Sequence, residues 1–131
     1  GGNCDIEQKE LYDRIDDAVC AVRSALEEGI LPGGGTSLLY EAIGLGDSLA
    51  ESILKVGFAS PFNQILDNSG KDYKIDNVEF GKGFNIKTGE YGDMYKMGVI
   101  DPAKVTKNAL RNAVSVATTI LTTNAIVTLK R

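Results

Sequence analysis

The chain has 131 residues, of which 43% are hydrophobic and 24% charged, and its formal net charge is -4. This size and composition are ordinary for one soluble globular domain with a real core. The acidic balance and the lack of a basic cluster argue against a nucleic-acid partner. No apolar run approaches the ~18 residues of a membrane span, so we expect no membrane partner. The sequence has no histidine, which removes the usual general base and the commonest metal ligand.

The two cysteines, Cys4 and Cys20, have no partners at metal-site spacing. Because one lies near the start and the other within a predicted helix, we expect two free thiols in a reducing compartment. The chain begins with Gly1-Gly2 and no methionine, which suggests a fragment or a processed product.

The first predicted element is a helix from about Glu7 to Glu28, ended by Gly29. Its apolar residues recur every three or four positions and form one stripe: Leu11, Ile15, Val19, Val22 and Leu26. On its acidic side Asp13 and Asp17 lie one turn apart. This pair is either a solvated acidic face or a carboxylate held for water or metal chemistry.

The segment Leu31–Ser37 holds three consecutive glycines between two helical segments. Glycines cost entropy to order, so such a run is rarely kept without a use. One interpretation is a flexible helix–helix loop. The other is a contact with a nucleotide, because bare backbone allows close approach and the amides that open the next helix point outward.

Two further helices are expected next, a short one over Thr36–Ile43 and another that runs to about Phe58. Between them Gly44-Leu45-Gly46 breaks the chain, and Ser48 with Glu51 has the spacing of a capping box. Three apolar residues of the second of these helices are predicted to face inward: Leu49, Ile53 and Val56.

A separate helix is predicted from Ser60-Pro61, with serine as N-cap and proline at the first helical position, to Asn68-Ser69-Gly70. From Lys71 to Tyr95 the period changes: Tyr73, Ile75 and Val78 alternate loosely, and Phe84–Tyr91 is typical of a hairpin that turns at Lys87-Thr88-Gly89. Two strands alone are marginal in water, so this hairpin must pack against the helices or a partner.

Asp101-Pro102 is predicted to cap the last long helix in the same way. One face of this helix carries apolar and small residues: Val105, Ala109, Ala113, Val116 and Ile120. Asn124–Leu129 is predicted to be a strand that must pair within this chain or with another. The expected fold is therefore mainly α, a helical bundle with a β-hairpin and a C-terminal strand.

Four motifs in order resemble the C-terminal part of a group I chaperonin, the GroEL type. They are Arg14–Val19 with Arg23–Ile30 and Pro32–Gly35; Gly83–Asn85 with Glu90–Met94; Met97–Thr106; and Thr122–Val127. The resemblance spans nearly the whole chain. It implies that residues 1–30 are the C-terminal intermediate-domain segment and residues 31–131 are the C-terminal portion of the equatorial domain.

The resemblance also implies a function, because the family is an ATP-driven folding chaperone built as rings of identical subunits. By position, Asp17 matches the carboxylate that activates or orients the attacking water. The residues that match nucleotide contacts are Gly34 and Gly35, the hairpin residues Asn85, Ile86 and Lys87, and Val99 and Asp101 around the adenine and ribose. Lys87 stands where the family usually has alanine.

The family's phosphate loop, its magnesium aspartates and its apical domain lie in an N-terminal part outside this sequence. We therefore expect ATP as ligand, Mg²⁺ held mainly by residues beyond this chain, and little ATP hydrolysis by this chain alone. The implied partners are other subunits of a ring and, through the apical domain, a co-chaperonin and unfolded clients. The implied location is the cytoplasm, or an organelle matrix in a eukaryote.

Two alternatives stay open at this point. The chain could be a helical structural or assembly module that does not bind nucleotide on its own. Less well supported is an unrelated small nucleotide-binding protein.

Overall fold

A computed structural model describes Gly2 and residues 4–70 and 78–128 of the chain. Within these residues the fold is mainly helical, as the sequence predicts. The elements in chain order are α1 (Asp5–Glu28), β1 (Ile30–Pro32), α2 (Thr36–Ile43), α3 (Leu49–Ser69), β2 (Lys82–Asn85), β3 (Glu90–Asp93), β4 (Ile100–Pro102) and α4 (Ala103–Leu121). Tyr73 and Ile75, two of the residues predicted to alternate loosely, lie outside the described residues.

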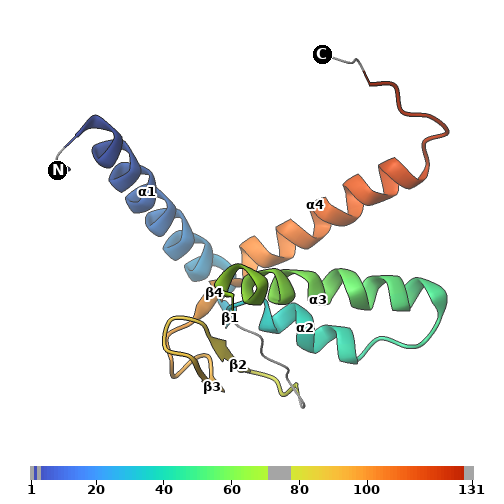
Figure 1. Cartoon of the computed structure of the whole chain (residues 1–131), viewed down its shortest axis with the longest axis horizontal. Helices are drawn as coiled ribbons and strands as arrows, with labels where there is room; N and C mark the ends of the chain where they lie inside the picture. Colours follow the sequence, from blue (N-terminus) through green and yellow to red (C-terminus); the bar gives the residue numbers. More distant parts are fainter. Residues whose placement is uncertain (1, 3, 71–77, 129–131) are drawn as a thin grey trace.

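The elements meet at the short antiparallel pair formed by β1 and β4 (Figure 1). From this junction α1 and α4 diverge, while α2 and α3 lie side by side and the β2–β3 hairpin lies below them (Figure 1). Neither β1 nor β4 is predicted from the sequence, because runs of three residues are too short to show alternation. In the pair, Leu31 lies opposite Asp101.

The junction also ties the two diverging helices together. Gly29 ends α1 with a φ of 85°, and its carbonyl oxygen accepts a 3.0 Å hydrogen bond from the amide of Ala103, the first residue of α4. Lys104 forms an ion pair with Glu27, and Lys107 forms another with Glu28. The C-terminal end of α1 and the N-terminal end of α4 therefore form one unit.

Helix α3 is continuous through Pro61, so the prediction of two helices separated at Ser60-Pro61 is wrong. An internal proline removes one hydrogen bond and costs ~3 kcal/mol. Phe62 and Leu66, one turn apart just beyond it, are 5% and 7% exposed. Burying such side chains contributes about 1.5–3 kcal/mol each, which offsets the cost of continuing the helix.

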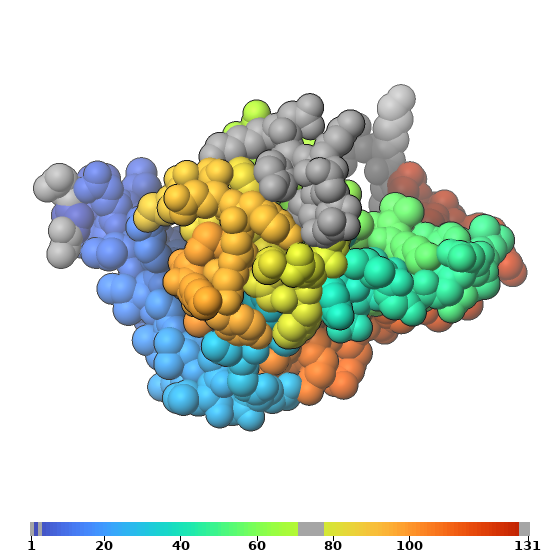
Figure 2. Space-filling view, turned by 90° about the horizontal axis from the view of Figure 1, so that it is seen from below, coloured from blue at the N-terminus to red at the C-terminus, as the bar shows by residue number. Residues whose placement is uncertain are grey.

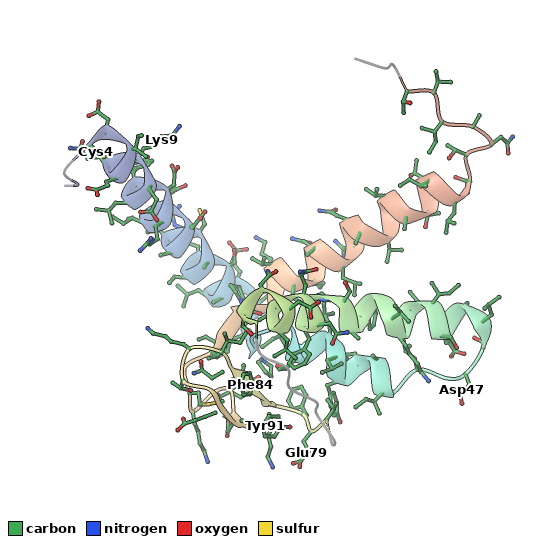
Figure 3. All side chains as sticks on the ribbon, in the orientation of Figure 1. Cys4, Lys9, Asp47, Glu79, Phe84 and Tyr91 are labelled. Atoms are coloured by element: carbon green, nitrogen blue, oxygen red, sulfur yellow. The ribbon has the colours of Figure 1, made fainter. Side chains whose placement is uncertain are left out.

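Phe62 and Leu66 form the core cluster together with Phe84 of the hairpin, and Leu39, Ile86 and Tyr91 pack around it. Phe84 and Tyr91 are labelled on the hairpin below the C-terminal end of α3 in Figure 3. The expectation that the hairpin packs against the helices is therefore confirmed. Its predicted turn is confirmed too, since residues 86–89 connect the two strands.

The predicted inward face of α3 is wrong. Leu49, Ile53 and Val56 are 80%, 64% and 73% exposed, because α2 packs along the opposite side of the helix. The apolar stripes of α1 and α4 are likewise exposed, and neither helix has a buried residue. Periodicity identifies residues that share a face, but it does not tell what covers that face.

Two predictions about the C-terminal region are also wrong. Asp101 is not an N-cap: it lies in β4, and Pro102 occupies the cap position with no side-chain hydrogen bond to the helix. Pairing with β1 holds Asp101 in an extended strand before the helix begins. Residues 124–128 form no strand in the described part of the chain, and Leu129 lies beyond it.

Candidate functional site

The triple glycine forms a hydrogen-bonded turn at the end of β1. The amide of Gly33 donates to the carbonyl oxygen of Val99 at 2.9 Å. The hydroxyl of Thr36 donates to the carbonyl oxygen of Gly33 at 2.8 Å, and that of Ser37 donates to Pro32 at 2.5 Å. Of the two interpretations drawn from the sequence, the flexible loop is therefore the poorer description.

All three glycines are packed closely against other segments. A Cβ built on Gly33 would lie 3.1 Å from the backbone of Val99 and Ile100, and one on Gly35 would lie 2.7 Å from the amide nitrogen of Phe62. Gly34 and Gly35 also have φ values of 68° and 75°. Packing and backbone conformation therefore account for the glycines, whether or not a ligand approaches them.

The opening of α2 still presents free donors. Among the described residues no acceptor is placed for the amides of Gly34 and Gly35. Such amides at the start of a helix can receive an anion or a polar ligand atom.

The hairpin residues at this site have structural roles of their own. The side-chain oxygen of Asn85 accepts hydrogen bonds from the amides of Lys87 and Thr88 at 3.0 and 3.4 Å, which closes the turn. Ile86 packs against the core cluster, and Lys87 is exposed. Of the three, Lys87 has the side chain most accessible to a ligand.

Asp101 lines a cleft of about 190 Å³ between α1 and the β1–β4 pair. The other lining residues are apolar: Ala21, Val22, Ala25, Ile30, Ile100 and Pro102. Burial in these surroundings raises the pKa of the Asp101 carboxyl above its ordinary value. Ligand pockets usually measure about 300–1,000 Å³, so this cleft could enclose only part of a nucleotide.

Asp17 is exposed on α1, outside this cleft. It lies four residues before Ala21, which lines the cleft, and residues at this spacing share a helix face one turn, about 5.4 Å, apart. A second hollow, of about 430 Å³, reaches Asp17 but is lined by residues of α1 alone, so it is a surface groove rather than an enclosed site.

The structure thus brings most of the predicted site residues together. Residues 78–100, yellow to orange in Figure 2, lie between α1 in blue and α2 in teal. The close approach of Met94 to Gly34 and of Gly83 to Thr36 places the hairpin beside the glycine turn. Asp17 is not among the residues brought together: it lies on α1, one helical turn before Ala21. Met94 and Thr36, which are 0% and 3% exposed, lie at the centre of this arrangement and were not predicted as site residues. Their only sequence signal was their place in the Glu90–Met94 motif and after the glycines.

The described part of the chain has no group of three His, Cys, Asp or Glu side chains placed to hold a metal ion. Both cysteines are free thiols, as predicted, and Cys4 lies at the outer end of α1 (Figure 3). Among the described residues no helix has the length and apolar character needed to span a membrane.

Comparison with known proteins identifies the family of this chain. The model of the TCP-1/cpn60 chaperonin family matches residues 1–131. The crystal structure of a group III chaperonin in the open state is similar over 79% of this chain, with a TM-score of 0.71 and 28% sequence identity. The matched region is 25% of that chaperonin chain, so this chain spans about a quarter of its length. The chain belongs to the TCP-1/cpn60 chaperonin family.

Proposed function

We propose that this chain is the intermediate and equatorial portion of an ATP-dependent folding chaperone subunit, and that it contributes one half of the ATP site together with contacts between ring subunits. Within the family we propose the group I type, on the four motifs that resemble it. In this proposal residues 1–30 belong to the intermediate domain and residues 31–131 to the equatorial domain.

One observation carries the proposal of a nucleotide site. Three segments far apart in the sequence come together at the glycine turn: Gly33 is hydrogen-bonded to Val99 just before β4, and Met94, just after the β2–β3 hairpin, lies against Gly34. Asp101, two residues after Val99, lines the cleft beside α1. The amides of the turn can receive polar atoms of a nucleotide, and the Asp101 carboxylate can accept hydrogen bonds from ribose hydroxyls. Burial of a carboxylate in an otherwise apolar cleft costs stability, which favours a role for Asp101 in binding.

For hydrolysis we propose that Asp17 orients the attacking water. Asp17 lies one helical turn before Ala21, which lines the cleft that holds Asp101, and this place on α1 supports the role. Phosphoryl transfer also needs groups that neutralise the developing charge, and this sequence contains no G-D-G-T-T-T run to cradle the phosphates. We therefore expect no chaperonin-like ATP turnover from residues 1–131 alone.

The test is calorimetric titration of the chain with ATP and ADP, with and without Mg²⁺, in the wild type and in Asp101→Asn. Loss of the charged acceptor should weaken binding about tenfold, which corresponds to ~1.4 kcal/mol. Asp67→Asn, on the exposed side of α3, is the matched control and should bind as the wild type does.

Equal affinity of Asp101→Asn and the wild type would contradict the proposed ribose contact. No binding at millimolar nucleotide would favour the other candidate, a helical assembly module. The exposed apolar stripes of α1 and α4 favour that candidate, since they offer surface for association with other polypeptides.

A further inference from the structure

Met94 is fully buried although it lies just after β3, in the short connection between the hairpin and β4. It is not a member of the core cluster of Phe62, Leu66 and Phe84. Its burial comes instead from contacts with the segments that carry the candidate nucleotide residues.

The side chain of Met94 lies between two glycines. A Cβ built on Gly34 would be 3.1 Å from the Cε atom of Met94, and a Cβ built on Gly83 would be 2.9 Å from its Sδ atom. The missing side chains of Gly34 in the turn and of Gly83 in β2 thus leave the space that the thioether fills. Methionine suits such an irregular gap because its chain is unbranched and adaptable.

The backbone of Met94 makes the same link. Its amide donates to the carbonyl oxygen of Gly81 at 2.8 Å, before β2, and its carbonyl oxygen accepts from the amide of Val99 at 2.9 Å. Val99 in turn accepts the bond from Gly33. One residue therefore contacts the glycine turn, the hairpin and the residue that precedes β4.

We propose that Met94 is a positioning residue of the nucleotide site. Its side chain fixes the position of the Gly34 backbone relative to Val99, and it touches no ligand itself. This inference rests on the proposed function for its effect on binding, but its effect on geometry can be measured without nucleotide. Small displacements of the groups that bind a ligand weaken binding. A residue that holds the turn in place therefore matters as much as the turn itself.

The experiment compares Met94→Ala, Met94→Leu and the matched control Met97→Ala. Met97 is a partly exposed methionine three residues away, whose methyl group lies near Gly92 and not near the turn. Three readings are taken on each chain: the backbone amide resonances of Gly34, Gly35 and Val99 without nucleotide, the Kd for ADP, and the unfolding midpoint.

Met94→Ala should move the resonances of Gly34 and Val99 and weaken ADP binding at least about tenfold at a temperature where the variant is folded. Met94→Leu, which keeps the volume, should restore both readings to nearly wild-type values. Met97→Ala should leave both unchanged.

The proposal is overturned if Met94→Ala shifts the Gly34 and Val99 resonances no more than Met97→Ala does. It is also overturned if Met94→Ala shifts these resonances but leaves the Kd for ADP unchanged. If the wild-type chain does not bind ADP at all, the proposed function of the isolated chain fails, whereas the resonances still decide whether Met94 sets the turn. If Met94→Ala does not fold, the same three measurements are made on Met94→Val, which retains part of the side chain.

Discussion

The amide of Gly33 and the carbonyl oxygen of Val99 are joined by a 2.9 Å hydrogen bond, which extends the β1–β4 pair by one step into the glycine turn. This bond joins the turn directly to the segment that leads into the strand with Asp101. A ligand held by both would find its contacts already arranged, which reduces the entropy lost on binding.

The core of the described residues is small, and substitution of a buried and an exposed leucine tests its location. Leu66 is 7% exposed and Leu26 is 83% exposed. We expect Leu66→Ala to lower the free energy of unfolding by about 2–5 kcal/mol. Leu26→Ala should change it by less than about 0.5 kcal/mol. Denaturant titrations of the two variants give the values, and a loss at Leu26 as large as that at Leu66 would mean that the face of α1 is covered in solution.

Two glycines should respond in opposite directions to alanine. Gly35 has a φ of 75°, and a Cβ there would meet the amide nitrogen of Phe62 at 2.7 Å. Gly35→Ala should therefore cost at least about 2 kcal/mol. A Cβ on Gly57, within α3, would have no atom within 4 Å. Gly57→Ala should stabilise the chain by about 0.5–1 kcal/mol. Thermal unfolding followed by circular dichroism measures both, and a stabilising Gly35→Ala would refute the close packing of the turn on α3.

The capping box of α3 offers a third measurement. The amide of Glu51 donates to the Ser48 hydroxyl oxygen at 3.3 Å, and the Glu51 carboxylate accepts from the Ser48 amide at 3.1 Å. Ser48→Ala removes this N-cap and should lower stability by about 0.5–2 kcal/mol. Ser52→Ala, one turn inside the same helix, serves as control and should have little effect. Equal midpoints for the two variants would show that the first turn of α3 contributes nothing to stability.

The ion pairs between the C-terminal end of α1 and the N-terminal end of α4 should stabilise the chain less as the salt concentration rises. Lys104 pairs with Glu27 and Lys107 with Glu28, and all four side chains are at least partly exposed. Lys104→Met should lower the unfolding midpoint slightly at low ionic strength, because an exposed pair gains little over solvation. At about 1 M salt, where the Debye length is about 3 Å, the difference should vanish. A difference that persists there would indicate lost packing of the lysine stem rather than lost charge.

The sequence predicted those elements whose signals are local. Ser48 with Glu51, Gly29 after α1, and the turn before Glu90 each determine the backbone through neighbours a few residues away, and each is found as expected. The local signals failed where distant contacts outweighed them. Burial of Phe62 keeps α3 continuous through Pro61, and pairing with Leu31 makes Asp101 a strand residue instead of a cap.

The candidate site was predicted only in part, for a related reason. Gly34, Val99 and Asp101 were predicted as site residues from motifs. Met94 also stands in a motif, but nothing in it or in Thr36 indicates which segments meet around their buried side chains. No periodicity in the sequence indicates that Gly83 of the hairpin lies against Thr36 of α2. Such contacts are a property of the tertiary fold.

The stability of the chain should depend on pH through the half-buried carboxyl of Asp101. Burial raises its pKa in the folded chain above the ordinary value that it has when the chain is unfolded. The folded state therefore binds the proton more strongly, so this group's contribution to stability is fully present below the ordinary pKa and is lost as pH rises through the raised one. Asp101→Asn has no charge to bury and should lack this loss.

We therefore expect the wild type and Asp101→Asn to have similar free energies of unfolding near about pH 3, and the variant to be the more stable one near about pH 7. Urea titrations across this range measure the difference, and comparison with the variant cancels the opposite trend from Asp47 and Glu51, whose pKa values are lowered by their hydrogen bonds. A variant that is more stable at neutral pH but binds nucleotide less well would show that the carboxylate is kept at a cost in stability for its role in binding. A wild type that is the more stable of the two at neutral pH would instead mean that Asp101 has an unrecognised partner, and that the carboxylate serves the fold.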